Sequence, residues 1–101
     1  MSEAPQAIRH VIIRGRVQRV GYRYWTEYTA RDQGLTGWVR NRHDGTVEAV
    51  FAGPAEAVAE MIAACRKGPP GARVEAIEER DATAGELAMR GHDQFAVLPT
   101  A

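Results

Sequence analysis

The chain has 101 residues, which suits one domain, and its 45% hydrophobic and 26% charged content is typical of a globular protein. Its 13 basic and 13 acidic side chains cancel, so the composition argues against a general nucleic-acid or membrane-surface binder, whose affinity needs a basic surplus. No apolar run approaches the roughly 18 residues needed to cross a bilayer, and residues 1–5 lack the pattern of a signal peptide. We therefore expect a cytoplasmic protein.

The first two predicted elements are a strand and a helix, joined by a loop that contains glycine. Residues 7–14 are rich in β-branched side chains, and both faces of this segment are largely apolar, which predicts a central strand. Residues 22–33 carry Tyr22, Trp25 and Tyr28 near helical spacing and end before Gly34, which favours a helix.

A hairpin and a second helix follow along the chain. Residues 36–42 and 46–51 flank His43-Asp44-Gly45, which is a signal for a β-hairpin. Pro54 suits the start of a helix and Gly68 its end. Between them an apolar stripe repeats at helical spacing and is formed by Val58, Met61, Ile62 and Cys65.

The last predicted strands are 73–79 and 94–98, and the segment between them reads as a polar loop. The order of elements is therefore β-α-β-β-α-β with an extra terminal strand. This order predicts an α+β, ferredoxin-like fold, in which two helices pack on one face of an antiparallel sheet. We expect a single domain over residues 1–101, with its core at about 7–98.

The loop between the first strand and the first helix is the first candidate site. Three arginines, Arg16, Arg19 and Arg23, lie within eight residues there. A loop that leads into a helix N-terminus can direct several backbone N–H groups at an anion. Arg23 lies at the positive end of the predicted helix, where a bound phosphate would offset its charge. The alternative is an ordinary loop with a solvated arginine.

Asn41, at the end of the predicted strand 36–42, is the second candidate. The alternative is an asparagine that only helps the hairpin turn. We expect this strand to run antiparallel to the first strand, which would place Asn41 away from the loop if the two strands were neighbours. The sequence alone leaves their separation open.

Other chemistry has weaker support in the sequence. Cys65 lies on the apolar stripe, which indicates a buried structural cysteine. The three histidines show no ligand spacing, so we expect no metal site. The chain also lacks the P-loop pattern of nucleotide hydrolases. We expect the aromatic residues Trp25, Tyr28 and Trp38 to pack on the core or the sheet in preference to stacking on nucleic-acid bases.

Two segments carry a resemblance to a known family. Gly15-Arg-Val-Gln-Arg-Val-Gly-Tyr-Arg23 resembles the phosphate-binding signature of acylphosphatases, and Gly37-Trp-Val-Arg-Asn41, with Gly45-Thr-Val47 and Gly53 after it, resembles their second signature. The resemblance implies hydrolysis of a small-molecule acyl phosphate to a carboxylate and inorganic phosphate, without metal or cofactor. It implies that Asn41 lies close to Arg23 and positions the attacking water. It also implies that Arg23 holds the phosphoryl group together with backbone N–H groups of the loop Arg16, Val17, Gln18, Arg19, Val20, Gly21 and Tyr22.

The first signature departs from the family at two positions. Arg19 stands where the family usually has glycine, and a left-handed backbone there would cost about 1–2 kcal/mol for an arginine. Arg19 either adopts an ordinary conformation and adds positive charge beside the substrate, or it distorts or occludes the phosphate-binding loop. Tyr22 replaces a phenylalanine, which is a mild change if its hydroxyl finds a partner.

The leading hypothesis is thus a monomeric, metal-independent acylphosphatase. The alternative is a catalytically weak, acylphosphatase-like module that binds an anion or a protein partner. A nucleic-acid-binding ferredoxin-like domain comes third, because the chain is neutral and lacks an aromatic RNA-binding motif.

Overall fold

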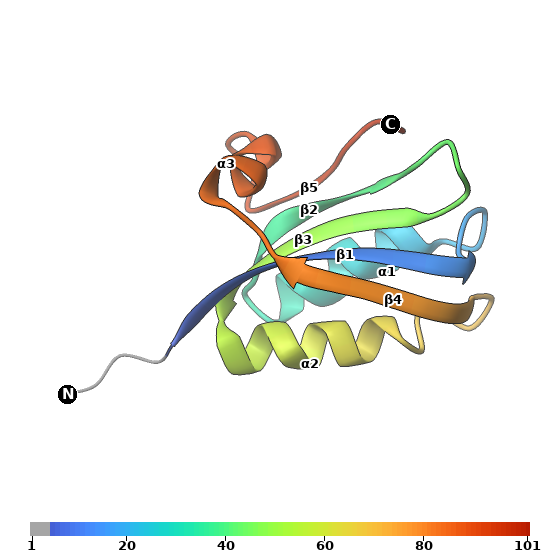
Figure 1. The fold of residues 1–101 in the computed structure, drawn as a ribbon, viewed down its shortest axis with the longest axis horizontal. Coiled ribbons are helices and arrows are strands. Elements are labelled where there is room, and N and C mark those ends of the chain that lie inside the picture. Colours follow the sequence, from blue (N-terminus) through green and yellow to red (C-terminus); the bar gives the residue numbers. More distant parts are fainter. Residues whose placement is uncertain (1–4) are drawn as a thin grey trace.

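The five strands of this protein form one sheet in the order β4-β1-β3-β2-β5 (Figure 1). The computed structural model describes residues 5–101; residues 1–4, which belong to the segment without a signal-peptide pattern, lie outside the described residues. The elements are β1 (Gln6–Arg16), α1 (Tyr22–Asp32), β2 (Thr36–Asn41), β3 (Val47–Pro54), α2 (Ala55–Cys65), β4 (Arg73–Asp81), α3 (Ala84–Leu87), a 3-10 turn (Ala88–Arg90) and β5 (Phe95–Val97). The expected ferredoxin-like α+β fold is confirmed. Because β5 pairs parallel to β2, the sheet is mixed and not wholly antiparallel.

The direction of β2 differs from the expectation. Both β1 and β2 run antiparallel to β3, which lies between them, so β1 and β2 are parallel to each other. The prediction that β2 runs antiparallel to β1 was wrong, because β3 and not β2 is the neighbour of β1. Ile13 of β1 and Asn41 of β2 share the same partner on β3, Val47. The C-terminal ends of β1 and β2 therefore meet at the same edge of the sheet.

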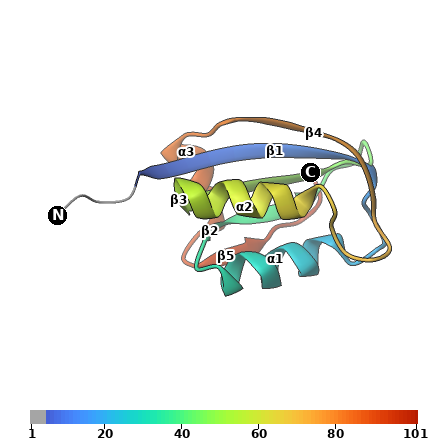
Figure 2. The same cartoon turned by 90° about the horizontal axis from the view of Figure 1, so that it is seen from below.

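The two long helices cover one face of the sheet (Figure 2). The predicted apolar stripe of α2 is confirmed, since all four of its side chains are buried. Helix α1 packs through Tyr22, Thr26 and Ala30, which lie four residues apart and share one face. The expectation that Tyr28 packs on the core was wrong: it lies off that face and is 74% exposed.

The opposite face of the sheet is partly covered by α3, a helix that the sequence reading took for a polar loop. Thr83 caps α3 through a capping box with Glu86, and the Nε1 of Trp38 donates a hydrogen bond of 2.7 Å to the backbone oxygen of Glu86. Trp38 is only 1% exposed as a result, which confirms that it packs on the sheet. None of the helices in residues 5–101 combines the length and the apolar character that crossing a membrane requires.

Candidate active site

The end of β1 lies against a bulge in β4 just before the arginine-rich loop. The register between these strands shifts between Arg14 and Gly15. Gly15 has a φ of 128°, and a β-carbon at this position would collide with the backbone oxygen of Arg73. Only glycine allows this close approach of the two strands. This close contact ties the start of the loop 17–21 to β4.

The loop then enters α1 through Gly21, the N-cap residue, in a left-handed conformation with a φ of 79°. No side chain caps this helix and no acidic residue lies in its first turn. Within residues 5–101, no backbone N–H group from position 18 to position 24 donates a hydrogen bond. The positive end of the helix and the preceding loop therefore present several free donors to an anion.

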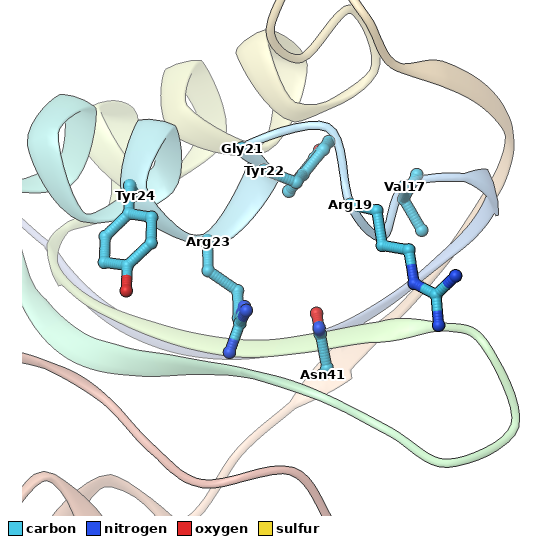
Figure 3. Close-up of a pocket in the computed structure, with 7 residues that line it drawn as sticks. All are labelled: Val17, Arg19, Gly21, Tyr22, Arg23, Tyr24 and Asn41. Carbon is cyan, nitrogen blue, oxygen red and sulfur yellow. The ribbon is translucent and has the colours of Figure 1, made fainter.

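A pocket of about 90 Å³ lies against these donors. Figure 3 shows Arg23 reaching from the first turn of α1 and Asn41 reaching from β2 toward the same space. Predicted site residues from three elements thus come together, as the resemblance implies. The pocket is lined by Val17, Arg19, Gly21, Tyr22, Arg23, Tyr24 and Asn41.

Three predicted loop residues do not line the pocket with their side chains. Arg16 ends β1 and is exposed opposite Arg73 of β4. Val20 packs against the hydrophobic core, and Gln18 turns toward the β2–β3 hairpin. The sequence reading missed Tyr24, which lines the pocket and is 67% exposed. Its position next to Arg23, in the first helical turn, was the available signal.

The guanidinium of Arg23 has no acidic partner among residues 5–101. The guanidinium carbon of Arg23 lies 5.9 Å from the centroid of the Tyr24 ring, a distance at which a cation is attracted weakly to an aromatic face. Its charge also lies at the positive end of α1, so an anion in the pocket would be stabilised by both.

The side chain of Asn41 has an unsatisfied polar atom. Its side-chain oxygen Oδ1 is buried and has no hydrogen-bond partner in the described residues. Leaving such a group unpaired costs about 1–3 kcal/mol. The backbone of Asn41 is held in place, because its oxygen accepts a hydrogen bond of 3.0 Å from the N–H of Ala101. A residue that lines the pocket therefore carries a buried acceptor without a donor, on a backbone that is held in place.

Gln18 connects the loop to the hairpin that follows Asn41. Its side-chain Nε2 donates hydrogen bonds of 2.7 Å to the backbone oxygen of Arg42 and of 2.9 Å to that of Thr46. The hairpin itself is closed by Asp44, whose carboxylate accepts from the N–H and the hydroxyl of Thr46, and these bonds lower the pKa of Asp44. Gln18 thus sets the distance between the loop and the end of β2.

Tyr22 anchors the other side of the loop. Its hydroxyl donates a hydrogen bond of 2.6 Å to the backbone oxygen of Cys65, so the hydroxyl has the partner that the substitution for phenylalanine requires. Burial raises the pKa of Tyr22 well above its ordinary range. Cys65 is fully buried, as expected, and burial raises the pKa of its thiol to about 12. Neither group is ionised near neutral pH.

Arg19 has a φ of 61°, so it occupies the left-handed region that favours glycine. Of the two alternatives stated for Arg19, the ordinary backbone conformation is therefore ruled out. The exposed side chain lies on the rim of the pocket, on the other side of Asn41 from Arg23 (Figure 3). The pocket stays open between the two arginines.

Comparisons with known proteins agree with this geometry. The Acylphosphatase family model matches residues 9–96. An acylphosphatase of Nitrobacter hamburgensis is 55% identical over 94 residues, which cover 92% of this chain and 95% of that protein. An acylphosphatase of Bradyrhizobium diazoefficiens is 56% identical over 96 residues, which cover 94% of this chain and 97% of that protein. The crystal structure of the Bacillus subtilis acylphosphatase has a TM-score of 0.80 at 33% identity and covers 93% of this chain and 99% of its own. The chain belongs to the acylphosphatase family of hydrolases.

Proposed function

We propose that this enzyme hydrolyses small acyl phosphates, with Arg23 as the ligand of the phosphoryl group and Asn41 as the residue that positions the attacking water. The observation that carries the proposal is the buried, unpartnered Oδ1 of Asn41 in the same pocket as the unpaired guanidinium of Arg23. An amide oxygen can accept a hydrogen bond from a water molecule and so direct the water's lone pair toward phosphorus.

The reaction needs no further catalytic group from the protein. The water oxygen forms a bond to phosphorus while the bond between phosphorus and the acyl oxygen breaks. The carboxylate leaves with the electron pair of that bond, and the proton of the water passes to a phosphate oxygen. A carboxylate is a good leaving group, so no general acid is required. Phosphoryl transfer has a loose transition state, and its charge is stabilised by positioned donors.

The donors that stabilise this charge are Arg23 and the backbone N–H groups of the loop. We assign this role to the N–H groups of the loop from Arg16 to Tyr22; those from position 18 onward, and those of the first turn of α1, donate no hydrogen bond within residues 5–101. Their positions are fixed before substrate binds, because Gly15, Gln18 and Tyr22 hold the loop to β4, to the hairpin and to α2. Donors that need no rearrangement contribute most to the rate.

The test is the hydrolysis of benzoyl phosphate in the presence of EDTA, with Arg23→Gln as the variant. We expect turnover by the wild type in EDTA and a loss of at least about 100-fold in kcat/KM for Arg23→Gln. Arg66→Gln is the matched control, because it removes the same charge from an exposed position outside the pocket. Folded wild-type protein without turnover above background would overturn the proposal in favour of a module that only binds anions.

We also propose that the protein works as a cytoplasmic monomer, without nucleic acid or a membrane as partner and without a cofactor. Its balanced charge supports the absence of a polyanionic partner, and its single, buried thiol suits a reducing compartment. Light scattering at micromolar concentration should give the mass of one chain. A dimer mass would contradict the proposed monomer.

A further inference from the structure

We infer that Arg19 selects acyl phosphates whose acyl group carries a second negative charge, such as a carboxylate. The inference rests on the proposed function, because it assigns the acyl side of the same substrate. It begins from the division of the pocket into an inner part and a rim. Arg23, Asn41 and the loop donors form the inner part, and Arg19 and Tyr24 contribute exposed side chains to the rim.

The size of the pocket decides where the acyl group lies. The pocket measures about 90 Å³ and its donors are those of the phosphoryl site. A phosphoryl group that occupies these donors leaves the acyl group to extend past the rim. On the rim it meets the guanidinium of Arg19 on one side and the ring of Tyr24 on the other (Figure 3). One cation and one aromatic face therefore meet the part of the substrate that differs between acyl phosphates.

Arg19 is free to bind such a group. It is exposed and has no acidic partner among residues 5–101. It also keeps a left-handed backbone, with a φ of 61°, where a glycine would be unstrained. A residue held in a disfavoured conformation beside a functional pocket calls for a functional reason. A planar guanidinium binds a carboxylate through two parallel hydrogen bonds.

The surroundings of Arg19 favour an anion as well. The β1–α1 loop, the β2–β3 hairpin and the α2–β4 connection lie at the same end of the molecule (Figures 1 and 2). Four further exposed cations without an acidic partner in the described chain belong to this end: Arg16, Arg66, Lys67 and Arg73. Arg16 even faces Arg73 across the β1–β4 pair, where like charges repel. In a chain with no net charge, this end is locally positive and attracts the more negative of two substrates.

The test compares two substrates that differ by one charge. The first is 4-carboxybenzoyl phosphate, which carries a carboxylate. The second is 4-carbamoylbenzoyl phosphate, which carries a neutral amide of the same shape in its place. Neither substrate can cyclise. We expect the wild type to have a kcat/KM about three- to tenfold higher for the carboxylate at low salt. This ratio should fall to about one in Arg19→Gly and in Arg19→Gln. It should also shrink in the wild type as the salt concentration rises, because the contact is exposed.

The two variants separate charge from backbone strain. Arg19→Gly removes the charge and the strain, whereas Arg19→Gln removes the charge and keeps the strained β-carbon. If the two variants lose the preference for the carboxylate substrate to the same extent, the preference comes from the guanidinium. Arg66→Gln is the control for net charge: it removes one cation of the surrounding field without touching the pocket, so it should keep most of the wild-type ratio. A wild-type ratio that persists in Arg19→Gln, or that is lost equally in Arg66→Gln, would overturn the inference while leaving the proposed hydrolysis intact. If the wild type hydrolyses neither substrate, the proposed function itself fails.

Discussion

Replacement of Asn41 by alanine should lower activity and raise stability at the same time. The side-chain Oδ1 of Asn41 is buried without a partner, and such a group costs about 1–3 kcal/mol in the folded state. After allowance for the lost packing of the amide, we expect the free energy of unfolding to rise by about 1 kcal/mol. For a domain of this size that corresponds to a Tm about 4–8 °C higher. The loss of one positioned group should lower kcat by about 10²–10³.

The assay combines urea unfolding with benzoyl phosphate kinetics on the same preparations. Gln33→Ala is the control. Gln33 lies at the C-terminal end of α1, and its Oε1 is the other buried polar side-chain atom in residues 5–101 that has no hydrogen-bond partner. It should gain stability in the same way and keep the wild-type kcat. A kcat of Asn41→Ala within threefold of wild type would refute the role in positioning water. A loss of stability would refute the reasoning that the oxygen is unpaired.

Two further predictions concern groups next to the pocket. Gln18→Met nearly keeps the size of the side chain and adds no charge, but it cannot donate to the backbone oxygens of Arg42 and Thr46. Steady-state kinetics should show kcat falling about tenfold with KM little changed, and a rise in KM alone would contradict a link to Asn41. Burial alone would raise the pKa of Glu48, but hydrogen bonds from His10 and Arg40 hold it below the ordinary 4.5. Its contribution to stability is therefore present above that pH and lost as the pH falls through the lowered, folded-state pKa. In urea unfolding at pH 7 and pH 3, the wild type should lose more stability than Glu48→Gln, and equal losses would show that Glu48 does not contribute.

The sequence predicted those features of the fold that repeat locally. The β-branched run predicted that β1 is a central strand, and the apolar stripe predicted which face of α2 is buried; both predictions are confirmed. The direction of β2 relative to β1 was predicted wrongly, because it depends on which strand lies between them. Helix α3 was missed although Thr83 and Glu86 have the spacing of a capping box. Its short length leaves no helical periodicity to detect.

The site was predicted as a set of residues and not as an arrangement. Motif spacing indicated Arg23 and Asn41, but the bond from Gln18 to the hairpin joins residues 24 and 28 positions apart and leaves no local pattern. The conformation of Arg19 was left open, because its residue type argues against the left-handed backbone that it adopts. The sequence does not show how distant segments are placed relative to each other in the folded chain, and this placement decides whether two side chains meet.

The hydrogen bonds of residues 98–101 have a consequence for how the enzyme folds. Leu98 donates its N–H to the backbone oxygen of Val39, Ala101 donates to that of Asn41, and the oxygen of Ala101 accepts from His43. Asn41 is therefore held by chain about 60 residues downstream, whereas the loop between β1 and α1 is held by the hairpin, α2 and β4, which all come earlier along the chain. Pairing across so long a loop is slow, because its closure entropy precedes any gain from the new contacts. The half of the site proposed to bind phosphate can therefore form before the half proposed to position the water, which is completed among the last steps.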